Sequence, residues 1–255
     1  MTLDGLRLAA TLLTVIPIRQ KVYQIEVTRG VAGAAIAWSP LVGLVLGAVA
    51  AAVLYGASQV LGPLTGAVLA VAVLAALTRG LHLDGLADLA DGLGSGRPAE
   101  QALEIMRNSD IGPFGVVTLM LTLLVQVAAL AHAGPGRRGE AALIAAVVTG
   151  RLAIVWACRP GVPAARASGL GAMVAGTVRP AVAAALTAVG LAVAGVLATT
   201  GIASWTLPVA VAAGLLASLA LAWHATRRLG GITGDVLGGI AETAATVCLL
   251  IAAAT

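Results

Sequence analysis

Apolar residues run in long stretches along most of the chain, and short polar segments separate them. A helix needs about 20 residues, sometimes 17 or 18, to cross the roughly 30 Å hydrocarbon core of a bilayer. Seven stretches approach or exceed that length: 31–55, 64–80, 113–133, 141–158, 181–200, 205–223 and 236–254. The pattern therefore predicts an all-α fold, a polytopic transmembrane helical bundle of about seven spans.

The polar segments predict shorter helices at the edges of this bundle. Residues 3–18 contain Asp4, Arg7 and Pro17, so an interfacial helix suits them better than a span. We expect one integral membrane domain over residues 1–255.

An acidic segment, residues 80–112, is inserted between the second and third predicted spans. Pro98 is typical of a helix start and Gly112-Pro113 of a stop, so a short amphipathic helix is expected over residues 98–109. We expect the whole segment to be cytoplasmic.

Composition supports the membrane class. Hydrophobic residues make up 60% of the chain and charged residues 10%, and the mean hydropathy is +1.02. Soluble domains carry about 25% charged residues, so too little polar surface is present for a soluble globule. The basic residues are scattered between spans and not clustered, which argues against a nucleic-acid partner. Cys158 and Cys248 are isolated, and neither suggests a disulfide or a metal site.

Most of the fifteen Lys and Arg residues lie in four polar segments. These are the N-terminal arm and residues 81–112, 159–180 and 224–235. The positive-inside rule places such segments in the cytoplasm. Every polar constellation capable of chemistry then lies on one side of the membrane, and the C-terminus lies on the other.

The sharpest constellation is the segment His-Leu-Asp-Gly-Leu-Ala-Asp-Leu-Ala-Asp-Gly, residues 82–92. Asp84, Asp88 and Asp91 are spaced i, i+4, i+7, which places them within an arc of about 60° on one helix face. No Lys or Arg is interleaved among them, so a cation is expected to neutralise them. Oxygen ligands favour Mg²⁺, with Mn²⁺ as the alternative. The alternative without a functional role is an acidic turn exposed to water after a span.

Two isolated ionisable residues, one beside this face and one inside a later span, have open roles. His82 lies about 160° around the helix from Asp84, so it is not expected to bind the same ion. It either contacts substrate or caps the preceding span. Arg151 lies inside a predicted span, where an ionisable group is costly and suggests function. Its guanidinium can bind a phosphate bidentately, and snorkelling or pairing with an acid is the alternative.

A glycine-rich segment opens the last span, at residues 230–239. Glycines allow close backbone approach, and successive N–H groups at a helix start can bind an anion. Asp235, preceded by Thr233 and Gly234, can ligate the metal or accept a proton. Glycine-rich loops alone are weak evidence, so the neighbouring acid carries this prediction.

Three motifs together resemble the cobalamin synthase family, the adenosylcobinamide-GDP ribazoletransferases. They are the residues of 80–92, Leu-Glu-Ile-Met-Arg-Asn-Ser at 103–109, and Gly-Gly-Ile-Thr-Gly-Asp-Val-Leu-Gly at 230–238. The resemblance implies a multi-pass enzyme of the bacterial inner membrane that uses Mg²⁺, with its active site facing the cytoplasm. It implies two substrates, adenosylcobinamide-GDP and α-ribazole (or its 5′-phosphate), and release of GMP.

We assign roles to ten residues on this basis. Asp84, Asp88 and Asp91 are the expected metal ligands, and one of them, or Asp235, is the expected base. The candidate substrate-binding residues are His82, Arg107, Asn108, Arg151, Thr233 and Gly234.

One position departs from the family pattern, which reads Met-Arg-Asp-Ser. Here Asn108 replaces the acid and Asp110 follows two residues later. Two residues are about 200° along a helix, so Asp110 cannot replace that acid unless the helix has ended. The alternative to the Asn108 assignment is an interfacial helix with an intrahelical Glu104–Arg107 pair.

Two rival functions remain open at this point. A phosphatidyltransferase of the CDP-alcohol type also places spaced Asp and Gly at a span edge, but the Ala-Arg after Asp84-Gly85 is missing. A cation-coupled transporter would place its charges near the bilayer midplane in broken helices. Self-association into a homo-oligomer is left open.

Overall fold

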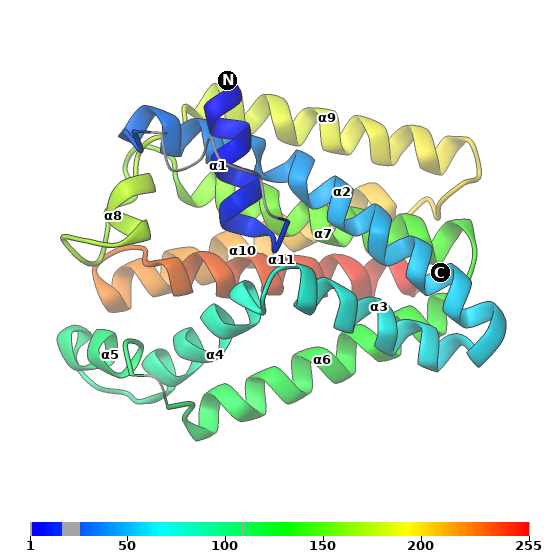
Figure 1. Ribbon diagram of the computed structural model, residues 1–255, viewed down its shortest axis with the longest axis horizontal. Helices are drawn as coiled ribbons and strands as arrows, with labels where there is room; N and C mark the ends of the chain where they lie inside the picture. Colours follow the sequence, from blue (N-terminus) through cyan, green and yellow to red (C-terminus); the bar gives the residue numbers. More distant parts are fainter. Residues whose placement is uncertain (1, 17–25, 109, 255) are drawn as a thin grey trace.

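The computed structural model describes residues 2–16, 26–108 and 110–254, and these residues fold as α-helices joined by turns (Figure 1). Within them no β-strand forms, and a single isolated bridge joins Ala164 to Ile232. The helices are α1 (Leu3–Leu13), α2 (Arg29–Leu61), α3 (Pro63–Leu77), α4 (Leu81–Gly94), α5 (Ala99–Ile105), α6 (Pro113–Ala133), α7 (Arg137–Ala157), α8 (Leu170–Val174), α9 (Pro180–Thr199), α10 (Leu207–Leu229) and α11 (Gly234–Ala253).

Among the described residues, six helices are long and apolar enough to cross a membrane: α2, α6, α7, α9, α10 and α11. They confirm six of the seven predicted spans and the polytopic helical class. The span expected over residues 64–80 is different. Its helix α3 ends at Leu77, and α4 leaves at an angle of 89°, so the pair is a broken span or a re-entrant loop.

The break between α3 and α4 is built into the backbone. Arg79 and Gly80 have φ of 54° and 67°, and this left-handed conformation cannot continue a right-handed helix. A helix end inside a bilayer leaves carbonyl groups that need donors. The N–H of Val15 donates to the carbonyl of Leu77 at 2.8 Å, so the chain just after α1 satisfies one of them. Hydropathy alone does not reveal such a stop.

The predicted N-terminal helix is present as α1, which packs against α2. Its interfacial placement stays a prediction, and the last residues of the expected range, Pro17 and Ile18, lie outside the described residues. The helix expected over 98–109 is shorter, because α5 ends at Ile105 and the amides of Arg107 and Asn108 donate to carbonyls only three residues earlier.

Helices α7 and α11 form the centre of the bundle (Figure 1), and they are the two most buried of the six spanning helices. Glycine makes this contact possible. A Cβ at Gly150 would lie 2.7 Å from the carbonyl oxygen of Ala241, so a side chain there would push the two helices apart. Helix α9 lies at the edge of the bundle and contacts α10 and α7.

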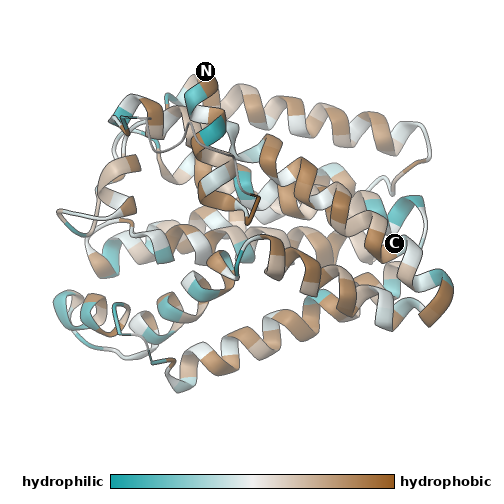
Figure 2. Ribbon diagram, in the orientation of Figure 1, coloured by the Kyte–Doolittle hydropathy of each residue, from teal (hydrophilic) through white to brown (hydrophobic). Residues whose placement is uncertain are grey.

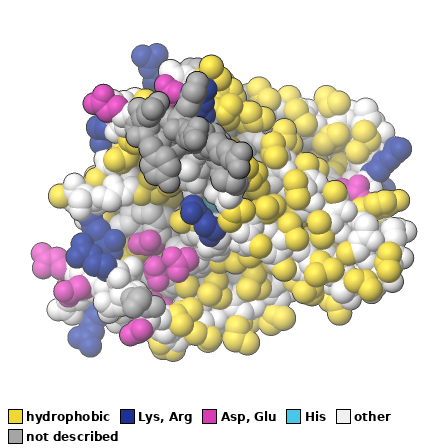
Figure 3. Space-filling view, in the orientation of Figure 1, with side chains coloured by type: hydrophobic (Ala, Val, Ile, Leu, Met, Phe, Trp, Pro, Cys, Tyr) yellow, Lys and Arg dark blue, Asp and Glu magenta, His cyan; other side chains and the backbone are white. Residues whose placement is uncertain are grey.

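Polar residues concentrate at the ends of the bundle. Figure 2 shows apolar residues along the lengths of the helices, and Figure 3 shows an apolar belt on the outer surface. Charged side chains gather at the end where α4, α5 and α8 lie, and a smaller group lies at the opposite end. The protein is therefore a multi-pass membrane protein with one strongly charged end.

Candidate functional site

The candidate site forms where α4 crosses the first turn of α11. Gly85 and Gly238 meet at this crossing. A Cβ at Gly85 would lie 3.0 Å from both the Cα and the carbonyl oxygen of Asp235. Two glycines thus let the backbones touch, which brings Asp84 and Asp88 of α4 beside Asp235 of α11. The two sequence motifs, at 80–92 and 230–238, therefore lie side by side and form one candidate site.

Asp84 and Asp88 have carboxylates available for a ligand. Asp84 is exposed and Asp88 is half-buried. No protein donor hydrogen-bonds to either carboxylate among the described residues. Partial burial, together with the neighbouring charges of Asp84, Asp235 and Asp91, raises the pKa of Asp88 to about 6, and the charge of Arg166 opposes that shift. Asp88 lies on α4, outside the six helices that can each span a membrane.

Asp91, the third acid of the motif, is placed differently. It is buried, and its two oxygens accept hydrogen bonds from the backbone N–H groups of Gly112 at 2.7 Å and Gly115 at 2.9 Å. These amides belong to the start of α6, where the first N–H groups have no partner within the helix. Asp91 therefore caps α6 in this conformation. The helical spacing of the three acids is as expected, but only Asp84 and Asp88 face open space.

Asp235 is held by its own helix start. Thr233 is the N-cap of α11 and its hydroxyl accepts from the N–H of Val236 at 3.2 Å. The same hydroxyl lies 3.2 Å from Oδ2 of Asp235, to which it donates. Thr233 is buried. It therefore orients Asp235 and does not face a substrate directly.

Arg166 is the cation of the site. Its Nη1 lies 3.9 Å from Oδ2 of Asp235, and its Nη2 donates to the carbonyl of Leu103. The charge of Arg166 also acts on Asp88. A single arginine thus connects α5, the α4 acids and the start of α11.

The glycine-rich segment holds Arg166 in place. The N–H of Ile232 donates to Pro163 at 2.9 Å, and the carbonyl of Ile232 accepts from Ala165 at 3.0 Å. A Cβ at Gly231 would lie 2.5 Å from Pro163 and Ala165 atoms. The glycines therefore allow the loop that carries Arg166 to pack closely against this segment. Several of the N–H groups that were expected to bind an anion instead donate to oxygen atoms of the protein.

The remaining predicted residues lie apart from the exposed acids. His82, on α4, and Arg151, on α7, are both buried. Arg107 and Asn108 are exposed just beyond α5, as is Asp110, and no described contact joins them to the acids. Ser109 of the same motif lies outside the described residues. A phosphate-binding role for Arg151 needs an accessible guanidinium, which this conformation does not present.

Sequence reasoning missed two residues that the structure singles out. Arg166 lies in a loop that is placed beside the acids by its backbone hydrogen bonds with Ile232. Because Ile232 is distant in the sequence, no local pattern identifies Arg166. Glu242 lies inside the last span, and an ionisable residue within a span is itself a signal of function. The criterion that singled out Arg151 would also have found Glu242.

The donor set at this site fits Mg²⁺ that shares its shell with a substrate. No group of three or more His, Cys, Asp or Glu side chains in the described part of the chain forms a complete metal site. Mg²⁺ usually takes only one or two carboxylates and fills its shell with water and phosphate oxygens. Asp84 and Asp88, with Asp235 adjacent, supply that number.

Comparison with known proteins agrees with these motifs. The family described as Cobalamin-5-phosphate synthase matches residues 5–253. An adenosylcobinamide-GDP ribazoletransferase of Frankia casuarinae is 42% identical, covering 98% of this chain and 94% of that protein. Proteins of the same description from Nocardioides sp. and Bradyrhizobium diazoefficiens are 38% and 39% identical over 98% of this chain, covering 99% and 93% of those proteins.

No solved structure matches the chain. The family match nevertheless covers α2 to α11 in full, including every helix that builds the site. The chain therefore belongs to the cobalamin-5-phosphate synthase family.

Proposed function

We propose that the chain transfers the corrinoid phosphoryl group of adenosylcobinamide-GDP to the 5′-hydroxyl of α-ribazole or its 5′-phosphate. The products are GMP and adenosylcobalamin or its 5′-phosphate. The observation that carries this proposal is the meeting of Asp84, Asp88, Asp235 and Arg166 at one crossing of α4 and α11. The names of the relatives support the same substrates.

The reaction exchanges one phosphoester partner for another. The 5′-oxygen of the ribazole forms a bond to the phosphorus on the corrinoid side, and the bond from that phosphorus to the bridging oxygen breaks. GMP leaves with the bridging oxygen, and the hydroxyl proton passes to a carboxylate. In-line geometry and charge stabilisation provide most of the catalysis in phosphoryl transfer.

Each site residue has a role that follows from its position. Asp84 and Asp88 would hold Mg²⁺, which when bound supplies positive charge to the diphosphate oxygens. Asp235 is oriented by Thr233 and is the candidate acceptor for the hydroxyl proton. Arg166 is the candidate for binding a non-bridging phosphate oxygen, because guanidinium groups bind phosphates bidentately.

We place the site at the cytoplasmic face of the bacterial inner membrane. The strongly charged end of the bundle carries α4, α5 and α8 (Figure 3), and cytoplasmic segments are rich in Lys and Arg. Both water-soluble substrates would reach the acids from that side. The family match does not favour the phosphatidyltransferase or the transporter.

The test is turnover by Asp84→Asn and Asp88→Asn variants in lipid nanodiscs, with GMP release as the readout. We expect a loss of at least about 100-fold for each, because an amide removes the charge that binds Mg²⁺. Asp4→Asn is the matched control. It removes an exposed carboxylate paired with Arg7 on α1, far along the chain from the site, and should keep wild-type turnover. Near wild-type GMP release by both site variants would overturn the proposed site.

A further inference from the structure

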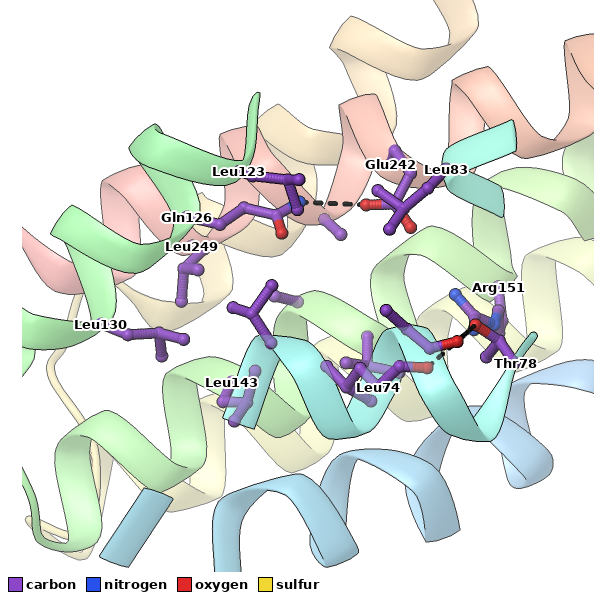
Figure 4. Close-up of a pocket in the computed structure, with 15 residues that line it drawn as sticks. Leu74, Thr78, Leu83, Leu123, Gln126, Leu130, Leu143, Arg151, Glu242 and Leu249 are labelled. Carbon is purple, nitrogen blue, oxygen red and sulfur yellow. Dashed lines mark hydrogen bonds between the residues drawn. The ribbon is translucent and has the colours of Figure 1, made fainter. Parts of the chain in front are cut away.

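A small cavity of about 50 Å³, lined mainly by apolar side chains, lies inside the bundle, in the angle between α3 and α4 (Figure 4). Thr78 at the end of α3 and Leu83 on α4 both line it. Its other polar residues are Gln126 of α6, Arg151 of α7 and Glu242 of α11, and the rest of the lining is apolar. None of these side chains is among the residues proposed to carry the reaction, which are Asp84, Asp88, Asp235 and Arg166.

Arg151 enters the cavity as a buried, unpaired charge. It is 4% exposed, and its Nε has no hydrogen-bond partner among the described residues. Its stem passes Gly43 of α2, where a Cβ would lie 2.8 Å from Cγ of Arg151. The packing therefore fixes the guanidinium in the interior. A charge in this position is costly unless an opposite charge or water compensates it.

Glu242 is the acidic side chain that lines the same cavity. Its Oε2 accepts a hydrogen bond from Nε2 of Gln126 at 2.9 Å, and that amide also donates to Thr246 at 2.9 Å. Figure 4 shows Glu242 beside Gln126 on one side of the cavity and Arg151 near Thr78 on the other. The two charges act on each other, yet no direct ion pair joins them in the described part of the chain. Both side chains line the same cavity, so a group small enough to enter the cavity could bridge them.

Water fits this position. A buried water needs roughly 10–15 Å³ of cavity volume and two to four polar partners, so a cavity of about 50 Å³ has room for about three to five waters. We propose that Arg151 and Glu242 form a water-bridged ion pair that fixes α4 at its bend and so positions Asp84 and Asp88. Both are positioning residues and touch neither substrate nor metal.

The cavity acts on α4 through the first residues of that helix. Leu83 lines the cavity, and His82 is buried within reach of the charge of Arg151. Asp84, the next residue, is exposed on the other side. If one charge of the pair is removed, the other is left as a buried charge without a partner, next to the first turn of α4. The helix must then shift or admit more water, and the acids shift with it.

The test is a double-mutant cycle with Arg151→Met, Glu242→Gln and the double variant in nanodiscs. One readout is thermal unfolding, and the other is the Mg²⁺ concentration that gives half-maximal GMP release. We expect each single variant to unfold at a lower temperature and to need about tenfold more Mg²⁺, and the double variant to recover most of both losses. Arg151→Lys, which keeps the charge, should stay near wild type.

Leu207→Ala is the matched control for destabilisation alone. Leu207 is buried at the start of α10 and does not line the cavity. This variant should lower the unfolding temperature and leave the Mg²⁺ dependence unchanged. Effects of the two single substitutions that add in the double variant would overturn the ion pair, as would a double variant that does not fold. Folded single variants with wild-type Mg²⁺ dependence would overturn the positioning role.

The positioning role rests on the proposed function, but the ion pair does not. Coupling in thermal unfolding is measurable without turnover. If wild-type protein releases no GMP, the proposed function fails while the unfolding cycle still decides the ion pair.

Discussion

Replacing Gly85 by alanine tests whether backbone contact between α4 and α11 sets the geometry of the site. A Cβ at Gly85 would lie 3.0 Å from the Cα and the carbonyl oxygen of Asp235, and 3.2 Å from the Cα of Gly238. Ordinary van der Waals contacts begin at 3.4 Å, so the two helices must separate by a few tenths of an ångström, about 0.4 Å at the closest atoms. The atoms in contact are backbone atoms, which no side-chain rotation can relieve.

A separation of this size is enough to damage catalysis. Misplacing reacting groups by about 1 Å can cost about 100-fold in rate, and catalytic groups must hold their positions to about 0.5 Å. A shift of a few tenths of an ångström is less than half of that, so we expect Gly85→Ala to lower kcat for GMP release by up to about tenfold. Overpacking of this kind costs about 1–3 kcal/mol of stability, so the variant should still fold.

The assay is GMP release at saturating substrates in nanodiscs, with thermal unfolding measured on the same samples. Gly56→Ala is the matched control, because a Cβ at Gly56 on α2 has no neighbour within 4 Å. Alanine is favoured over glycine inside a helix by about 0.5–1 kcal/mol, so this control should be fully active and no less stable. Wild-type kcat in a folded Gly85→Ala protein would refute the role of this contact.

Three further predictions address individual groups. Asp91→Asn should weaken the hydrogen bonds to Gly112 and Gly115 that cap α6, and so lower the free energy of unfolding by about 0.5–2 kcal/mol. We expect little change in kcat. A loss of turnover as large as that of Asp84→Asn, at wild-type stability, would show that Asp91 binds the metal instead. Arg166→Met should lower kcat/KM by about 10- to 100-fold, the value of one or two charge-assisted hydrogen bonds, and an unchanged kcat/KM in steady-state kinetics would exclude phosphate binding by Arg166. Chelation of divalent ions should abolish GMP release and added Mg²⁺ should restore it, whereas full activity after exhaustive chelation would contradict a divalent-metal mechanism.

The spans and the acidic motif were predictable from the sequence because they depend on local patterns. Runs of apolar residues identify six spanning helices, and i, i+4, i+7 spacing places three acids on one side of α4. The bend after Leu77 was not predictable, because the hydropathy stays high to its end. It depends on the left-handed backbone at Arg79 and Gly80 and on a donor from Val15, which is distant in the sequence.

The groups that contact the acidic residues could not be predicted from the sequence. Asp91 has the same spacing as its neighbours, and only its contact with the start of α6 distinguishes a capping carboxylate from a free one. Arg166 reaches the site through a loop paired with Ile232. Glu242 and Arg151 are recognisable as ionisable residues inside spans, but their common cavity follows only from the packing of α3, α4, α7 and α11.

The most direct test of the central claim is the product balance of the purified wild-type chain in nanodiscs. With adenosylcobinamide-GDP, α-ribazole and Mg²⁺, we expect GMP and adenosylcobalamin in equal amounts, and neither product when α-ribazole is left out. GMP release that does not depend on α-ribazole, or no GMP from any combination of these substrates, would contradict the transfer reaction proposed for this site.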